Sequence, residues 1–231
     1  MKYQIYYTAN VSLFFQIFIA LVCVYGLQIK LSPEDYILKE VLLMETIVQI
    51  IEICFYLWLI FNFHKINYEV TYIRYFDWFL TTPTMLLSLV FFIYYLENKN
   101  KKLLSVMDIL SENKKTFIII LLSNLLMLFF GFLGEIDKMS KLTSFVLGSS
   151  MFGICFYTIY KNFVKSSELG NYIFFSTLII WSLYGIASLL SYVPKNIFYN
   201  FLDIFSKNIN GLLLFGYILW LTKDKLLFSL L

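Results

Sequence analysis

Charged residues are scarce in this sequence: aspartate, glutamate, lysine and arginine make up 14% of its 231 residues, against about a quarter in soluble domains. Proline occurs three times and glycine nine times, which excludes collagen-like chains and proline- or glycine-rich linkers. The net charge of +3 is small and forms no basic stripe, so we expect no nucleic-acid partner. Hydrophobic residues make up 60% of the chain and the mean hydropathy is +0.77, which indicates a protein of the lipid bilayer.

Cysteine is also rare. Cys23, Cys54 and Cys155 each lie inside an apolar segment and show no paired spacing. This pattern excludes a disulfide-rich scaffold and favours three small buried hydrophobic side chains, with no metal site expected. The first thirty residues lack a basic start and a small-residue cleavage site, so we expect a retained helix instead of a signal peptide.

What the sequence does contain is long apolar runs. An α-helix needs about 20 mostly apolar residues to cross ~30 Å of hydrocarbon. Such runs occupy the chain almost from end to end. This pattern predicts a single-domain, all-α membrane protein in which residues 1–231 form a bundle of seven transmembrane helices. No room is left for a soluble catalytic unit, and we do not expect an enzyme. The expected spans are roughly 9–29, 37–62, 72–96, 115–135, 141–164, 171–193 and 198–222.

Lysine placement predicts the orientation of the bundle. Of 17 lysines, 11 lie in the connections between spans one and two, three and four, and five and six, or after the seventh, and five lie on the other side. Basic loops stay in the cytosol, so we expect an extracellular N-terminus and a cytosolic C-terminus. The connection between spans three and four is the longest, and its residues 103–110 predict either a short amphipathic helix at the interface or a plain solvated loop.

Four ionisable residues stand out within the third and seventh apolar spans. Arg74 and Asp77 lie in the third span, and Asp203 and Lys207 lie in the seventh. A charge at the bilayer centre costs at least ~2.5 kcal/mol, so such residues are candidates for function. Within each span the two residues are three or four apart and share a helix face, so each pair can form an ion pair. One interpretation is purely structural, with ion pairs that only hold helices together.

The third span carries further polar residues around Asp77. Thr81 follows by one helical turn, and we expect its hydroxyl to donate to the Asp77 carboxylate. Pro83 leaves a carbonyl group one turn back without its partner, which nearby threonine hydroxyls can satisfy. A kinked helix with one buried ion pair explains Arg74 and Pro83. It does not explain a second carboxylate, Asp203, in the seventh span.

The chemistry of Lys207 favours a cofactor site. Burial disfavours a charged amine, and a neutral amine is a nucleophile that condenses with an aldehyde. The protonated product needs a nearby anion, which Asp77 and Asp203 supply. Together with Arg74 these residues form a neutral set, which makes their burial tolerable.

Two motifs occur together in this chain. The third span contains RYFDWFLTTP at 74–83, and the seventh contains DIFSK at 203–207. In this combination the chain resembles the microbial (type 1) rhodopsins, over all seven spans. In that family a retinal is linked to the lysine of the seventh helix.

The resemblance implies roles for five residues. Lys207 would carry all-trans retinal as a protonated Schiff base. Asp77 would be the primary counterion and proton acceptor, and Asp203 the second counterion. Arg74 would be the gate on the extracellular side, and Tyr56 would donate a hydrogen bond to the second counterion.

The resemblance also implies a retinal pocket with flat aromatic walls. Trp78 and Trp181 match the tryptophans that sandwich the polyene. Phe145 stands where many members have tryptophan, and Gly185 and Ser188 replace the usual proline and tryptophan of the sixth span. The implied pocket residues are Tyr75, Trp78, Thr81, Thr82, Met85, Phe145, Trp181 and Tyr184.

The chain departs from the usual proton-pump pattern at Ser88, eleven residues after Asp77, where outward pumps carry an acid as internal proton donor. Serine cannot supply a proton at neutral pH, so Glu45 and Glu52 in the second span become candidates for a proton or ion path. For Glu45, an ordinary interfacial charge at the end of the span is the alternative. The familiar extracellular pair of release glutamates is missing as well. The triplet of Asp77, Thr81 and Ser88 is most similar to the second group of rhodopsins from large algal viruses.

These features favour a light-driven outward proton pump that acts on protons within a lipid bilayer. A light-gated channel for small ions is the alternative, because Glu45, Gln49 and Glu52 form a polar stripe. A photosensor and a membrane protein without retinal rank below these. The family resemblance also implies a homo-oligomer, a trimer or a pentamer.

Overall fold

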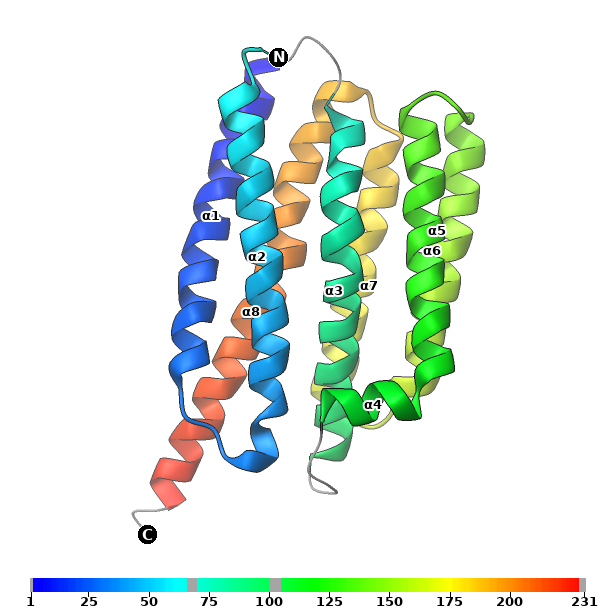
Figure 1. Cartoon of the computed structure of the whole chain (residues 1–231). Coiled ribbons are helices and arrows are strands. Elements are labelled where there is room, and N and C mark those ends of the chain that lie inside the picture. Colours follow the sequence, from blue (N-terminus) through cyan, green and yellow to red (C-terminus); the bar gives the residue numbers. More distant parts are fainter. Residues whose placement is uncertain (1, 66–69, 100–104, 229–231) are drawn as a thin grey trace.

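The computed structural model describes residues 2–65, 70–99 and 105–228. All regular elements in these ranges are helical (Figure 1). Seven helices are long and apolar enough to cross a membrane, which confirms the predicted seven-helix bundle. The elements are α1 (Lys2–Gln28), the 3-10 helix η1 (Pro33–Asp35), α2 (Ile37–Asn62), α3 (Thr71–Asn98), α4 (Val106–Glu112), α5 (Lys114–Glu135), α6 (Lys141–Phe163), α7 (Glu168–Ser188) and α8 (Tyr192–Phe228).

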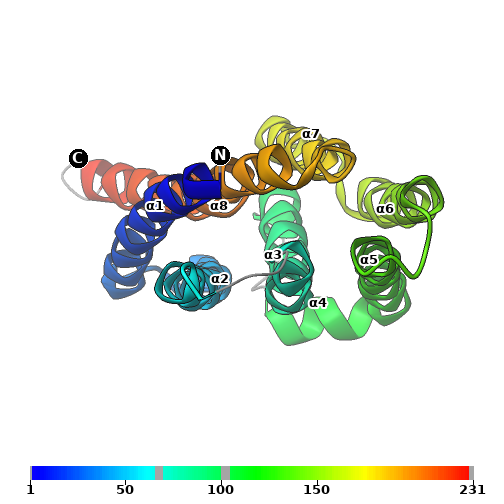
Figure 2. The same ribbon diagram turned by 90° about the horizontal axis from the view of Figure 1, so that it is seen from above.

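The long helices stand side by side, and α3 lies in the middle of the bundle between α2 and α5 (Figure 2). Helix α8 packs on α1, α2 and α7, while α5 and α6 form a close pair. The chain begins at the end of the bundle where the α5–α6 and α7–α8 connections lie, and it finishes at the opposite end (Figure 1). We call these the N-terminal end and the C-terminal end of the bundle.

The surface of the bundle is apolar and its interior is partly polar. Large hydrophobic side chains point outward, among them Phe14, Leu21 and Phe76. Because lipid tails are as apolar as these side chains, such a surface suits a bilayer. Cys23 and Cys155 are buried as expected, but Cys54 is exposed on this outer surface, so the expectation of burial is wrong for Cys54.

Several helix boundaries differ from the prediction: α1 begins at Lys2, seven residues before the predicted start, and the boundary between α7 and α8 is shifted. Helix α7 ends at Ser188, five residues before the predicted end of the sixth span, and α8 already begins at Tyr192. Pro194 lies in the first turn of α8, where the missing N–H has no helical partner to lose. Residues 194–197, which we expected in a connection, are therefore helical and belong to the same helix as Lys207.

The connection after α3 contains a helix. Helix α4 covers part of the predicted segment 103–110, of which residues 103 and 104 lie outside the described residues. The Ser105 hydroxyl caps it by accepting from the backbone N–H of Met107, at 3.2 Å. Ile109 is buried whereas Met107 is exposed, so α4 is one-sided, as the amphipathic alternative requires.

Helix α3 continues through Pro83. The Thr81 hydroxyl donates to the backbone carbonyl of Asp77 at 3.1 Å, and the Thr82 hydroxyl donates to that of Trp78 at 2.8 Å. The expected bond from Thr81 to the Asp77 carboxylate is therefore wrong. A threonine within a helix reaches the carbonyl four residues back more easily than a neighbouring side chain.

Candidate functional site

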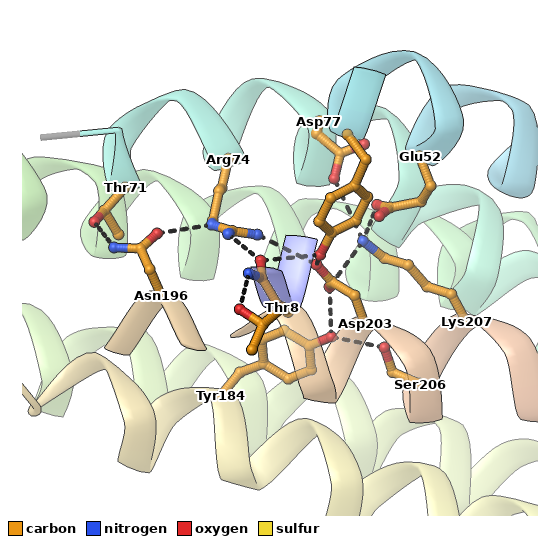
Figure 3. Close-up of polar contacts among 12 residues, drawn as sticks. Thr8, Glu52, Thr71, Arg74, Asp77, Tyr184, Asn196, Asp203, Ser206 and Lys207 are labelled. Atoms are coloured by element: carbon orange, nitrogen blue, oxygen red, sulfur yellow. Dashed lines mark hydrogen bonds and ion pairs between the residues drawn. The ribbon is translucent and has the colours of Figure 1, made fainter. Parts of the chain in front are cut away.

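The amine of Lys207 lies at the centre of the bundle, where it meets three carboxylates from three helices (Figure 3). Its Nζ forms an ion pair with Glu52 of α2. It lies 3.1 Å from Asp203 Oδ1 on its own helix and 3.3 Å from Asp77 Oδ2 on α3. Lys207 is 2% exposed and Glu52 is fully buried, so these charges are compensated by one another and not by solvent.

Glu52 changes the expected charge balance of the site. The sequence suggested a neutral set of Asp77, Asp203, Arg74 and Lys207. With Glu52 on the Lys207 amine, three carboxylates face two cations. The described set therefore carries one more formal negative charge than positive charge, and its burial depends on the ion pairs around Lys207 and Arg74.

Arg74 is fully buried and points away from Asp77. Its Nη1 lies 3.4 Å from Asp203 Oδ2, its Nε donates to Asn196 at 3.0 Å, and its Nη2 donates to Asn200 at 2.5 Å. The predicted ion pair between Arg74 and Asp77 is thus wrong: the described ion pair of Arg74 is with Asp203. Helical side chains lean toward the N-terminus of their helix, so Arg74 extends away from Asp77, which lies one turn further along.

Sequence reasoning missed the two asparagines that hold Arg74. Asn196 also donates to Thr71 Oγ1 at 2.9 Å, and Asn200 donates to Thr8 Oγ1 at 2.8 Å (Figure 3). The two asparagines and Asp203 are spaced three or four positions apart along α8, and this spacing indicates one polar helix face. The signal was overlooked because Asn196 was assigned to the connection before the seventh span.

Asp203 is held by hydroxyl groups from two sides. The hydrogen bond expected from Tyr56 is present, with Tyr56 Oη donating to Asp203 Oδ2 at 2.5 Å. Tyr184 Oη donates to Asp203 Oδ1 at 2.7 Å and lies 2.7 Å from Ser206 Oγ. In contrast, Asp77 Oδ1 has no hydrogen-bond partner among the described residues. The two aspartates therefore differ: Asp203 is fixed by its partners and Asp77 has an open acceptor site.

A cavity of about 380 Å³ extends from Lys207 between α3, α5, α6 and α7. Thr81 is buried but is not among its lining residues, which contradicts its expected place in the pocket. Met127, Gly148 and Phe152 line the cavity without having been predicted. The predicted residues that do line it are Tyr75, Trp78, Thr82, Met85, Phe145, Trp181 and Tyr184.

The lining fits a flat apolar molecule that carries an aldehyde. Trp78 meets Tyr184 edge-on, with ring centroids 5.6 Å apart. A Cβ atom on Gly185 would lie 3.7 Å from the Phe145 ring, so the glycine leaves open space where a larger residue would narrow the cavity. The buried amine of Lys207 lines this space together with the aromatic side chains. The donor set and the shape thus suit retinal.

Ser88 and Glu45 meet on the C-terminal side of Lys207. The Ser88 hydroxyl donates to Glu45 Oε1, and Glu45 is only 2% exposed. The interfacial alternative for Glu45 is therefore wrong, because α2 begins two turns earlier, at Ile37. A cavity of about 10 Å³, enough for roughly one water molecule, lies beside the pair. Gln49, one turn along α2 from Glu45, donates to the backbone carbonyl of Lys207 at 2.9 Å.

Comparison with known proteins places this architecture in a family. Residues 5–221 match the family model described as "Bacteriorhodopsin-like protein". The chain is similar to the crystal structure of the viral rhodopsin OLPVRII, with 29% identity and a TM-score of 0.82 over 94% of this chain and 98% of that one. No curated protein matches the chain.

Two further solved structures share the fold at 18% identity each. They are the blue light-absorbing proteorhodopsin from Med12, with a TM-score of 0.74 over 96% of this chain and 98% of that one, and the proton pumping rhodopsin AR2 from the marine alga Acetabularia acetabulum, with a TM-score of 0.73 over 95% and 96%. The expected resemblance to microbial rhodopsins, and to viral ones in particular, is confirmed. The chain therefore belongs to the bacteriorhodopsin-like protein family.

Proposed function

We propose that this chain is a retinal-binding photoreceptor that uses light to move protons outward across its membrane. The observation that carries the proposal is the convergence of three carboxylates on Lys207 Nζ at the end of an aromatic cavity of about 380 Å³. Retinal linked to Lys207 Nζ as a protonated Schiff base would supply visible absorption and a light-driven change of shape. The lysine excess assigns the N-terminal end of the bundle to the extracellular side.

Asp77 and Asp203 then have different roles in proton transfer toward the extracellular side. Asp77 accepts the proton from Lys207 Nζ, because one of its oxygens has no other partner among the described residues. Asp203 keeps its negative charge, because Tyr56, Tyr184 and Arg74 already occupy its oxygens. A fixed anion beside a proton acceptor gives the transfer its direction.

Glu45 is placed to return a proton to Lys207 from the cytosolic side. Ser88 stands where an acid would be expected on α3, but its hydroxyl donates to the carboxylate of Glu45 on α2. The acid thus sits on the neighbouring helix, close to the same position. Gln49, which donates to the backbone carbonyl of Lys207, lies one turn along α2 from Glu45.

Illumination of liposomes that contain the retinal-loaded protein tests the proposal. We expect a light-dependent pH change in the medium that an uncoupler abolishes. Retinal-bound protein that absorbs visible light but gives no uncoupler-sensitive signal would contradict proton pumping. A protein that stays colourless with all-trans retinal supplied would contradict the photoreceptor itself.

A light-gated ion channel is the second candidate, and a cluster of unpartnered polar atoms between α1, α2 and α8 favours it. Ser12 Oγ and both side-chain amide atoms of Gln16 and Asn208 have no hydrogen-bond partner among the described residues. All three residues are at most 3% exposed. Each such buried atom costs about 1–3 kcal/mol unless water or an ion satisfies it, so this seam favours hydration.

The register of α1 and α8 brings these amides together. Asn200 donates to Thr8 Oγ1, a pair 192 positions apart, and the same offset places Asn208 opposite Gln16. Photocurrents at different voltages distinguish the two candidates. A channel current reverses its sign with voltage and follows the ion gradients, whereas a pump current keeps its direction.

A further inference from the structure

A second buried ion pair lies at the N-terminal end of the bundle, away from Lys207. Glu135 is the last residue of α5, and Lys195 lies in the first turn of α8. Lys195 Nζ is 2.7 Å from Glu135 Oε1, and the two side chains are 3% and 8% exposed. Burying both charges carries a desolvation cost, and sequence reasoning had counted Lys195 as an ordinary lysine of a connection.

The cavity that begins at Lys207 reaches this ion pair. Glu135 is among the lining residues, and Tyr75 and Tyr199 line the space between. A Cβ atom on Gly131 of α5 would lie 2.7 Å from the Tyr75 hydroxyl oxygen, so that hydroxyl can approach α5 only because residue 131 has no side chain. The lining of one cavity therefore includes the Lys207 amine, the Glu135 carboxylate and two tyrosines.

The ion pair also adjoins the hydrogen-bond network of Arg74. Asn196, which accepts from Arg74 Nε at 3.0 Å, directly follows Lys195 in α8. A change in the hydrogen bond between Arg74 and Asn196 therefore acts on the helical turn of α8 that carries Lys195. Among the described residues, Lys195 of α8 forms an ion pair with Glu135, and Lys141 of α6 lines the same cavity.

We infer that Glu135 is the outer proton-transfer group of this protein and that Lys195 positions it. This assignment rests on the proposed outward proton transport. The Glu135 carboxylate takes up one proton that leaves the Asp77, Asp203 and Arg74 network, as its contact with Lys195 loosens. It becomes a neutral acid and then gives the same proton to water at the N-terminal end, while the ion pair re-forms. No other reactant is consumed.

The test compares the full-length, retinal-loaded protein with Glu135→Gln, which keeps an oxygen for Lys195 but cannot bind a proton. A pH-sensitive dye outside the membrane records proton release, and the absorbance change records deprotonation at Lys207. We expect the delay between deprotonation at Lys207 and proton release to be at least about tenfold longer than in the wild type. The absorption maximum and the rate of deprotonation should stay the same. Unchanged release timing in Glu135→Gln would overturn the assignment.

Asp137→Asn is the matched control. Asp137 is two residues away and exposed, and its φ of 55° is a conformation that asparagine tolerates. Release should keep its wild-type timing in this variant, and an equal delay there would contradict a specific role of Glu135.

Infrared difference spectra give a second measurement that does not depend on Glu135→Gln folding. We expect a carboxylic-acid band in the wild type between deprotonation and release, and a shift of that band in Glu135→Asp. A band that does not shift would overturn the assignment. A wild-type protein that binds retinal but moves no protons would instead overturn the proposed function, and this inference with it.

Discussion

The two halves of the bundle on either side of Lys207 are built differently. Toward the N-terminal end, Arg74, Asn196 and Asn200 form a continuous network of hydrogen bonds with Asp203. Toward the C-terminal end, Glu45 and Ser88 sit within a large apolar cluster, beside a cavity of only about 10 Å³. Under the proposed transport, a proton leaves through groups that are already hydrogen-bonded, whereas its replacement passes through a region with little open space. The comparison teaches that proton return, and not release, should limit the cycle.

Lys207→Ala should have the largest effect, because it removes the amine on which both halves converge. We expect complete loss of visible absorption after retinal is added, with a seven-helix fold retained in the circular dichroism spectrum. Lys195→Ala is the control, since this amine is also buried but lies at the end of the bundle. Colour that persists in Lys207→Ala would contradict the assignment of the retinal site.

Asp77→Asn should stop proton transport and shift the absorption maximum to the red. Removing a counterion makes the delocalised positive charge less costly in the excited state relative to the ground state. The spectrum and the light-driven pH change are measured together. A blue shift or an unchanged spectrum would show that Asp77 does not face the Lys207 nitrogen.

Glu45→Gln tests the half of the bundle toward the C-terminal end. We expect the return of a proton to Lys207 to slow by about 10²-fold, while release outward keeps its rate. Flash photolysis measures both steps. Glu34→Gln serves as the control, because Glu34 is an exposed acid at the same end of the bundle. A slowing of release instead of return would invert the comparison between the halves.

Asn196→Leu tests the hydrogen-bond network toward the N-terminal end of the bundle and should have the smallest effect. The substitution leaves Arg74 Nε without its described acceptor, which costs about 1–3 kcal/mol of folding free energy. The midpoint of thermal bleaching should fall accordingly. Asn162→Ala, which removes an exposed amide bonded to its own helix, should leave the midpoint unchanged.

Some features of the site follow from spacing within one helix, whereas others depend on contacts between helices. Asp203 and Lys207 could be placed from spacing alone, because residues four apart on one helix share a face. The partner of Arg74 could not, because it depends on how α8 is rotated against α3. The same holds for Glu52, whose approach to Lys207 makes the neutral charge set suggested by the sequence net negative.

The sequence by itself determined the seven spans, since the thickness of a bilayer sets the length of an apolar helix and composition reveals it. It also determined which residues within those spans are ionisable. Only the tertiary structure decided that Glu45 meets Ser88, that Arg74 turns from Asp77 to Asp203, and that Glu135 finds Lys195. Contacts between helices depend on tilt and rotation summed over the whole bundle, and no local spacing in the chain encodes them.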